Sequence, residues 1–286
     1  MHSNLPFASR ENPNPDPRKR VFCILSDDRV FQTKSPDMFN SAIKHAGING
    51  IYIPIKIKPD DLGKAIQGLK YLNFAGANIA VPYKEKVIPF LDMLSDEAEQ
   101  IGAVNTLTIE DQAISGHNTN AAGFLRAIEE VRFHSENKSA LIFGYGGAAR
   151  AVLFTLKHLK TKNFMITGRN PNKAKKLVSD LGGETIGFDE LKTRKLTADL
   201  VINATSAASH EESPEMAAIV ENLTLKNCQW IFDLNYGREN YFFRDLAQKS
   251  GTRFMDGIPM LAHQASKSFA LWTGIEIAPE IFLKGL

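Results

Sequence analysis

Along the first hundred residues, short apolar runs alternate with longer segments in which apolar and polar side chains recur at helical spacing. Residues 21–25, 51–57 and 75–81 predict buried strands. The segments that begin at Ser35-Pro36 and at Pro59 predict helices, with Ser35 as N-cap and Pro36 as first helical residue of the former. This order of strand, helix and strand is typical of a parallel α/β sheet.

The pattern then changes and starts again. Residues 104–109 and 113–117 predict a hairpin, and residues 119–131 predict a helix that leaves the first unit. From Ser139 a second series begins with a strand, a glycine turn and a helix to about residue 159, and its order predicts a doubly wound α/β unit. Its further predicted strands are 164–167, 200–204, 230–234 and 253–255, and the further helices are 171–181, 242–250, 260–272 and 279–286.

Length and composition agree with two α/β domains. The chain has 286 residues, about twice the common domain size. Its opening residues 1–20 carry Asn, Pro and charges but no apolar core, and we expect them to be a disordered lead-in. With 43% hydrophobic and 23% charged residues, the rest has an ordinary globular composition.

Charge and cysteine content exclude several classes of protein. A net charge of +2 is too small for the clustered positive field that nucleic-acid binding needs, and no apolar run reaches the roughly 18 residues of a membrane span. Cys23 and Cys228 both lie in apolar runs, which favours buried small hydrophobes over a disulfide or a metal ligand. We therefore expect a cytoplasmic protein that binds neither nucleic acid, membrane nor metal.

The glycine turn of the second unit predicts a dinucleotide site. Gly144-Tyr145-Gly146-Gly147-Ala148-Ala149 fits the G-x-G-x-x-G/A fingerprint between a predicted strand and a predicted helix. Gly144 permits the tight turn, Gly146 lets backbone N–H groups approach a pyrophosphate, and Ala149 lets the helix pack closely. The alternative is a simple strand-to-helix turn.

The residues after the next predicted strand indicate which dinucleotide binds. An NAD site usually has an acidic residue there, but this chain has Gly168-Arg169-Asn170. Arg169 and Lys173, one helical turn further on, are suited to a 2′-phosphate and predict NADP as cofactor. The alternative is that both are only solvated charges near a helix start.

Polar residues of the first unit are candidates for a substrate site. Thr33 and Ser35 place hydroxyls at a helix N-terminus, where a carboxylate is favoured, although Ser35 is equally suited to capping alone. Lys84 follows the end of a buried parallel strand, where open α/β sheets bind ligands. Amides and hydroxyls flank the predicted hairpin, and they suit either a polyol site or turn formation.

The order of these segments resembles the shikimate dehydrogenase family from about residue 21 to the C-terminus. The resemblance implies a substrate domain of residues 21–124 and 258–286, an NADP-binding Rossmann domain of residues 125–257, and hydride transfer between nicotinamide and C3 of a shikimate-like ring. The segments that carry it are Thr33 to Pro36, Asn78 to Lys84, Ile101 to Thr106, Asn118-Thr119, Gly144 to Arg150, Asn203 to Ser206, Asp233 to Tyr236 and Asp256 to Gln264.

Residue roles follow from the same resemblance. Thr33 and Ser35 match the hydroxyls that hold the shikimate carboxylate, Lys84 the catalytic lysine, and Asn105, Tyr236 and Gln264 further substrate contacts. Matches to the cofactor site are Gly144, Gly146, Gly147, Ala148 and Arg150 in the phosphate turn, Arg169 and Lys173 at the 2′-phosphate, Asn203, Thr205 and Ser206 along the cofactor, and Gly257 near nicotinamide.

Two departures from the family pattern concern the chemistry. Ala80 stands where the family has a threonine whose hydroxyl touches substrate, and Asn120 stands where it has the carboxylate that pairs with the lysine. An amide neither takes a proton at neutral pH nor holds a negative charge beside Lys84. A smaller departure is Gly168, where family members commonly have Asn.

Three functions therefore stay open at this point. The first is an NADP-dependent shikimate dehydrogenase of aromatic amino acid biosynthesis, acting as a monomer or homodimer. The second is a dehydrogenase for a related cyclitol acid such as quinate or an aminoshikimate, and the third is a non-catalytic NADP-binding regulatory protein. Turnover on a panel of cyclitol acids distinguishes the three.

Overall fold

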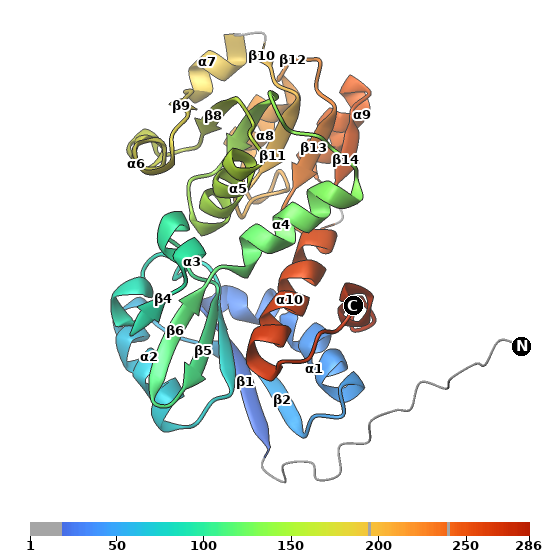
Figure 1. Ribbon diagram of the computed structural model, residues 1–286. Helices are drawn as coiled ribbons and strands as arrows, with labels where there is room; N and C mark the ends of the chain where they lie inside the picture. The colour runs from blue at the N-terminus through green and yellow to red at the C-terminus, as the bar shows by residue number, and fades with distance from the viewer. Residues whose placement is uncertain (1–18, 194–195, 239–240) are drawn as a thin grey trace, which may run out of the picture.

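The computed structural model describes residues 19–193, 196–238 and 241–286. They form two lobes, each built on a six-stranded sheet, which follow one another along the long axis of the molecule (Figure 1). Residues 1–18, most of the predicted lead-in, lie outside the described residues. Arg20, which that prediction included, instead begins the first strand, β1.

The first sheet is mixed, with the strand order β2-β1-β3-β5-β6-β4. Its β1 pairs in parallel with β2 and with β3, as the strand and helix order predicts. The predicted hairpin then adds β5 antiparallel to β3, and β6 antiparallel to β5. The strands are β1 (Arg20–Ser26), β2 (Gly50–Lys56), β3 (Gly76–Ile79), β4 (Met93–Leu94), β5 (Thr106–Glu110) and β6 (Ala113–His117).

Both faces of this sheet are covered because the central strand is apolar on both sides. Phe22 and Ile24 of β1 face α1 (Ser35–His45), α10 (Ile258–Thr273) and α11 (Pro279–Leu283). Cys23 and Leu25 face α2 (Leu62–Tyr71) on the other side. Short elements complete the lobe: the 3-10 turns η1 (Asp28–Gln32), η2 (Pro59–Asp61) and η3 (Ile88–Phe90), and the helix α3 (Asp96–Ile101).

The start of α1 differs by one residue from the prediction. Lys34 is the N-cap, Ser35 is the first helical residue and Pro36 the second. The Thr33 hydroxyl accepts a hydrogen bond from the Ser35 N–H at 3.2 Å, so Thr33 does the capping that we assigned to Ser35. Two further predicted helices are shorter than expected, because residues 59–61 form η2 and the terminal helix ends at Leu283.

The second sheet is parallel throughout, in the order β14-β13-β11-β7-β8-β9 that a doubly wound fold requires. Its strands are β7 (Ser139–Phe143), β8 (Asn163–Thr167), β9 (Glu184–Thr185), β11 (Leu200–Asn203), β13 (Trp230–Asp233) and β14 (Arg253–Met255). A separate short pair joins β10 (Leu196–Thr197) and β12 (Leu225–Lys226).

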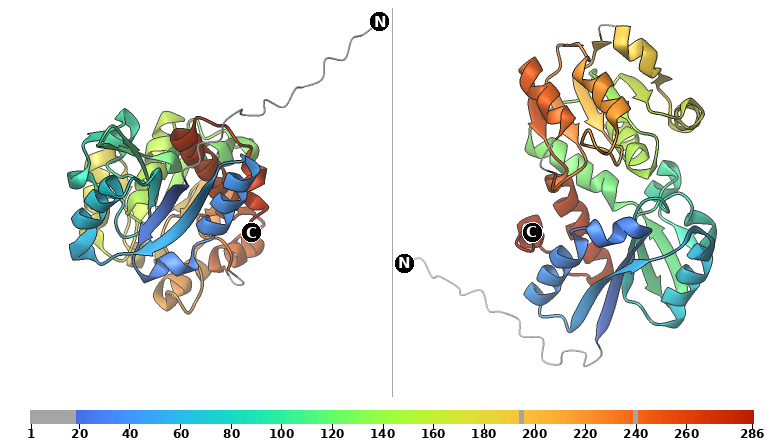
Figure 2. Two further views of the ribbon diagram at one scale, coloured as in Figure 1. Left: turned by 90° about the horizontal axis from the view of Figure 1, so that it is seen from below. Right: turned by 180° about the vertical axis from the view of Figure 1, so that it is seen from behind.

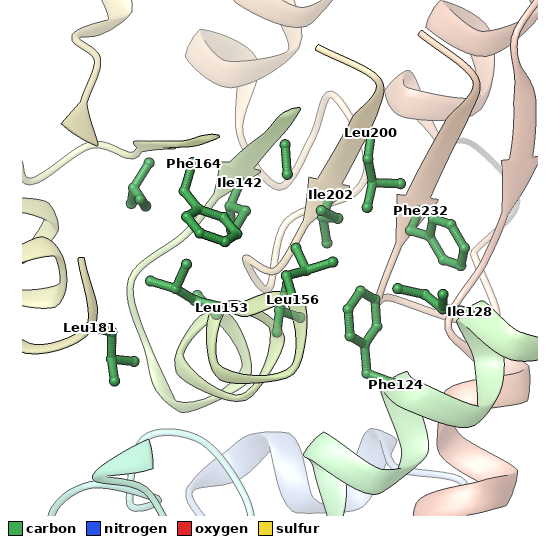
Figure 3. Close-up of a cluster of buried hydrophobic side chains, with 14 of the residues drawn as sticks. Phe124, Ile128, Ile142, Leu153, Leu156, Phe164, Leu181, Leu200, Ile202 and Phe232 are labelled. Carbon is green, nitrogen blue, oxygen red and sulfur yellow. The ribbon is translucent and has the colours of Figure 1, made fainter. Parts of the chain in front are cut away.

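Helices cover both faces of the second sheet. One face packs against α4 (Thr119–Glu130), α5 (Gly147–His158) and α6 (Pro171–Leu181), and side chains of these helices and of the strands form the cluster in Figure 3. The other face packs against α7 (Phe188–Thr193), α8 (Pro214–Glu221) and α9 (Phe242–Ser250). The glycine turn and α5 therefore stand at the centre of the lobe, between β7 and the first lobe.

Two helices, α4 and α10, connect the lobes and lie side by side (Figures 1 and 2). Gly123 permits this contact, since a β-carbon there would come within 2.6 Å of the Met260 carbonyl oxygen. At the far end of α10, Trp272 donates from its indole N–H to the Leu107 carbonyl at 2.9 Å and covers Gly76. The C-terminal segment is thereby anchored on the first sheet.

Cys23 and Cys228 are free thiols. Cys23 is buried and Cys228 partly buried, and burial raises the pKa of Cys228 to about 12 and that of Cys23 further. Both thiols thus stay protonated, as expected of small apolar side chains. None of the described helices is long and apolar enough to cross a membrane.

Candidate active site

A cavity of about 180 Å³ lies between the lobes, beyond the carboxyl ends of β1 and β3. It brings together every residue that the sequence assigned to substrate, although these residues are spread over more than 230 positions of the chain. Its polar lining consists of Thr33, Ser35, Asn78, Lys84, Asn105, Asn120, Tyr236 and Gln264, and its apolar lining includes Ala80, Ala148, Leu234 and Met260.

Three hydroxyls meet at one end of this cavity. The Thr33 and Ser35 hydroxyl oxygens are 3.0 Å apart, and the Thr33 oxygen is 3.5 Å from the phenol oxygen of Tyr236. Thr33 and Ser35 stand at the start of α1, which has no side-chain N-cap bond from Lys34, whereas Tyr236 belongs to the loop after β13 in the other lobe. Hydroxyls beside a helix N-terminus suit a carboxylate.

The opposite wall is a network of buried amides and hydroxyls centred on Asn105. Its amide N–H₂ donates to the Thr119 hydroxyl at 2.8 Å, to the Asn120 carbonyl at 3.1 Å and to the Gln264 carbonyl at 3.1 Å. Its carbonyl accepts from the Thr119 backbone N–H at 2.7 Å. These bonds hold Asn105, which immediately precedes β5, and side chains from α4 and α10 in one fixed arrangement.

A deeper layer of this network was not predicted as part of the site. The Ser268 hydroxyl lies 2.8 Å from that of Thr106 and 3.0 Å from that of Thr119. Asn78 donates to Thr106 and accepts from the Tyr52 hydroxyl at 2.8 Å. One signal was available in the sequence: Ser268 follows Gln264 by four residues, so both lie on the same helical face.

Lys84 is the only charged residue among the described residues that line the cavity. Its ammonium has no hydrogen-bond or ion-pair partner within the described part of the chain, and burial lowers its pKa to about 8. Its stem packs against the start of α5, where a β-carbon on Gly147 would come within 2.9 Å of the Lys84 Cβ. Asn120 turns its carbonyl to Asn105, and its N–H₂ group has no partner among the described residues.

A second cavity of about 180 Å³ lies on the other side of the glycine turn. Gly144 has a φ of +115°, and a β-carbon there would come within 2.8 Å of the Ala204 carbonyl oxygen. Gly146 caps α5 with no side-chain bond and has open space around it, so backbone N–H groups at the helix start remain available to an anion. Further lining comes from Val81, Tyr145, Gly168, Arg169, Phe188, Thr205, Ser206, Ser213 and Met216.

The two predicted cations are placed differently. Arg169 lines this cavity, is exposed, and has no partner among the described residues. Lys173 does not line it, and the Nζ of Lys173 lies 5.9 Å from the centre of the Tyr145 ring. The start of α6 is fixed by the Asn170 side chain, which accepts from the Lys173 backbone N–H at 3.1 Å.

Asn203 does not line the second cavity, but its hydrogen bonds fix the loop beside it. Its N–H₂ group donates to the Ala207 carbonyl at 2.8 Å and to both Asp233 carboxylate oxygens at 3.0 Å, and its carbonyl accepts from the Thr205 hydroxyl at 2.7 Å. Burial raises the pKa of Asp233 to about 6, although the bonds from Asn203 and Asn235 act in the opposite direction. Asn203 thus shapes the loop that bears Thr205 and Ser206.

Arg150 and three small residues of the predicted cofactor set lie outside the second cavity. The Arg150 guanidinium is buried and donates to the Ile101 carbonyl at 2.6 Å and to Asp180 at 2.9 Å. It therefore ties α5 to α3 and α6, and the match of Arg150 to a cofactor contact stays a prediction. Ala148 and Gly257 line the first cavity, and Gly147 contacts Lys84.

Two family models match the chain. The model described as shikimate dehydrogenase substrate binding domain matches residues 27–107, and the model described as shikimate / quinate 5-dehydrogenase matches residues 127–239. Together they match more than half of the chain. The first model matches much of the first lobe, and the second matches much of the second lobe.

Curated relatives and solved structures agree with these models. A shikimate dehydrogenase (NADP(+)) of Moorella thermoacetica is 38% identical over 86% of this chain and 86% of its own length, and one of Desulforamulus reducens is 38% identical over 90% and 91%. The structure of shikimate dehydrogenase from Aquifex aeolicus superposes with a TM-score of 0.82 at 29% identity, covering 93% of this chain and 97% of that one. Shikimate 5-dehydrogenase from Thermus thermophilus, in complex with NADP(H) and shikimate, gives 0.80 at 29% identity, covering 93% and 98%.

Proposed function

The chain belongs to the shikimate dehydrogenase family, and we propose from that premise that it binds its substrate in the cavity between its lobes, where it oxidises shikimate with NADP+ or reduces 3-dehydroshikimate with NADPH. The enzyme is an NADP-dependent oxidoreductase of the shikimate pathway. The observation that carries the residue assignment is the junction at Gly147, where the dinucleotide turn contacts the stem of Lys84, the one cation among the described residues of the substrate cavity.

The second cavity suits NADP in shape and charge. Gly144 and Gly146 keep the turn free of side chains, and the open start of α5 offers N–H groups to the pyrophosphate. Arg169 lines the cavity with a free guanidinium and no described acidic residue lines it, which suits a 2′-phosphate. When bound, the nicotinamide accepts or returns a hydride.

In the substrate cavity, we assign the two polar walls to the two ends of the substrate. The hydroxyls of Thr33, Ser35 and Tyr236 suit the carboxylate. The amides of Asn105 and Gln264, held by the buried network, suit the ring hydroxyls. An acid with several hydroxyls on a small ring uses both walls at once.

Lys84 is assigned as the proton-transfer residue. During oxidation, the C–H bond of the reacting carbon breaks and its hydrogen leaves as hydride, while the hydroxyl proton passes to the neutral Nζ of Lys84. The reverse reaction returns the proton from the ammonium. A lysine whose pKa burial lowers to about 8 has both forms available near neutral pH.

Two lining residues favour a related cyclitol acid as a second candidate substrate. Ala80 brings a methyl group to the cavity, and Asn120 presents an N–H₂ group that has no partner among the described residues, none of which brings a carboxylate to this cavity. An amide donor suits a substrate group that accepts a hydrogen bond. Quinate and aminoshikimate are the corresponding candidates.

Absorbance of NADPH at 340 nm, followed with shikimate and quinate in parallel, tests this function. We expect NADP+ reduction with shikimate, and a higher kcat/KM for quinate would favour the second candidate. Tight NADP+ binding without turnover on any cyclitol acid would contradict both and favour a regulatory protein. We also propose a cytoplasmic monomer or homodimer, which fractionation and sedimentation analysis test.

A further inference from the structure

We propose that Tyr145, the side chain within the glycine turn, determines the preference for the phosphorylated dinucleotide by filling the space beside Gly168 and holding Lys173 at the rim of the second cavity. This role rests on the proposed function, because it concerns the NADP that the enzyme uses. It goes beyond that function by assigning specificity to a residue at the unspecified position of the fingerprint.

The Tyr145 ring occupies the place where residue 168 would carry a side chain. A β-carbon on Gly168 would come within 2.6 Å of the ring Cε1 and 2.8 Å of Cδ1, closer than side chains approach one another. Tyr145, Gly168 and Arg169 all line the second cavity. The ring therefore forms the wall beside Arg169 that a residue larger than glycine would otherwise provide.

The same ring contacts a cation on the next helix. The Nζ of Lys173 lies 5.9 Å from the ring centre, within the range of a cation–π interaction. The backbone of Lys173 is fixed independently by the Asn170 cap. Because the helix start is fixed, the ring decides where the flexible end of the lysine lies, and it holds that charge near the cavity although Lys173 does not line it.

This arrangement acts on the phosphate rather than on the dinucleotide as a whole. The positive charges of Arg169, at the cavity wall, and of Lys173, on the face of the Tyr145 ring, add to one another near the end of β8. No described acidic side chain lines the cavity there. The 2′-phosphate of NADP+ brings negative charge to these two cations, whereas the 2′-hydroxyl of NAD+ is uncharged. Losing the ring should therefore weaken NADP+ binding more than NAD+ binding.

Isothermal titration of the full chain with NADP+ and NAD+ provides the first test. We expect Tyr145→Ala to lower the ratio of NADP+ to NAD+ affinity about fivefold, the size of an exposed cation–π interaction. Tyr145→Phe keeps the ring and should retain the ratio. Equal weakening of both nucleotides, or no change of either, would overturn the role.

A double-mutant cycle with Gly168 provides the second test. Gly168→Ala should push the ring away and lower the ratio in the wild-type background, but it should have no further effect in Tyr145→Ala, where the ring is gone. Gly68→Ala in α2, where a β-carbon meets nothing within 4 Å, is the control. Additive effects would overturn the role while leaving the proposed function intact. Failure of the unaltered protein to bind NADP+ would overturn both.

Discussion

The two cavities on either side of the glycine turn are similar in volume but are built in different ways. The substrate cavity is walled by buried side chains that bond to one another, as Asn105 does with Thr119, Asn120 and Gln264. The cofactor cavity is walled by turns and by exposed side chains such as Arg169, which bonds to no other described residue. The polar side chains of the first cavity are thus held in place by one another, whereas the Arg169 side chain of the second cavity is held by no other described residue.

Because of this difference, we expect a mutation to have different effects in the two cavities. A change in the buried network removes a ligand contact and also leaves a buried partner without its hydrogen bond, which lowers the free energy of unfolding. A change at the exposed wall affects only the ligand. The five predictions below test this separation, in order of decreasing effect.

The largest effect is expected at Lys84. Lys84→Met keeps the stem that packs on Gly147 but removes the amine, and kcat for shikimate oxidation should fall by about 10² or more, as is usual for loss of a general base. NADP+ affinity, measured by titration, should be unchanged. Lys86→Ala, an exposed lysine two residues on, is the control. Near-full turnover by Lys84→Met would remove Lys84 from the mechanism.

The next effect is the dependence of the rate on pH. The base must be neutral, and burial lowers the pKa of Lys84 to about 8, so the rate of oxidation should rise about tenfold per pH unit below 8 and level off above it. Reduction of the ketone needs the ammonium, so its rate should stay level below pH 8 and fall about tenfold per pH unit above it. Steady-state rates in both directions between pH 6 and 10 measure this. Parallel profiles in the two directions would contradict the assignment.

A smaller effect is expected at the exposed wall of the cofactor cavity. Arg169→Ala should weaken NADP+ binding by about 2 kcal/mol, the contribution of a hydrogen bond to a charged group, and leave NAD+ binding nearly unchanged. Its melting temperature should match the wild type. Lys175→Ala on the exposed side of α6 is the matched control. A preference for NAD+ in the unaltered protein would refute the prediction.

Asn120→Asp tests the wall of buried amides in the cavity that Lys84 also lines. One carboxylate oxygen replaces the carbonyl that accepts from Asn105, and the carboxylate as a whole adds a negative charge that no described residue brings to the cavity. If shikimate is the substrate, kcat/KM should rise about tenfold, or about 1.4 kcal/mol, which one charge-assisted hydrogen bond supplies. A flat or lower value in a variant with an unchanged circular dichroism spectrum would favour a related cyclitol acid.

The smallest effect concerns stability alone. Thr119→Val deletes a hydroxyl that accepts from Asn105 and lies 3.0 Å from that of Ser268, and we expect the free energy of unfolding to fall by about 1 kcal/mol. Thr224→Val, at an exposed position of the second lobe, should leave it unchanged. Urea denaturation of both variants measures the difference. Equal free energies of unfolding for the two variants would mean that the buried network does not contribute to stability, and would contradict the difference drawn between the two cavities.

Local sequence pattern predicted most of the fold. The helices 171–181 and 242–250 and the strand 253–255 have the predicted bounds, because proline, glycine or a change of hydrophobic period marks each end. Short elements such as α3 and α8 were not predicted, since α3 has only six residues and α8 is apolar around most of its surface. The division of the domains at residues 124 and 258 stays a prediction, with α4 lying across the first boundary.

The candidate site was predicted by resemblance more than by spacing. Gathering of the substrate residues into one cavity depends on how α10 returns to the first sheet, and no local pattern specifies that contact. Arg150 shows the limit most clearly. Its position in the turn matches a cofactor contact, which stays a prediction, whereas its hydrogen bonds to the Ile101 carbonyl and to Asp180 depend on the packing of α5 on α3 and α6 and have no local signal in the sequence.

Gly147 has a consequence for how such fingerprints are interpreted. The fingerprint G-x-G-x-x-G/A leaves this position unspecified, yet a β-carbon there would come within 2.9 Å of the stem of Lys84, from the opposite lobe. An alanine at this position would displace the base rather than the nucleotide. In this chain, a position that the cofactor fingerprint leaves unspecified is therefore restricted to glycine by a lysine of the first lobe, and a substitution in one lobe changes the geometry of the other at this point.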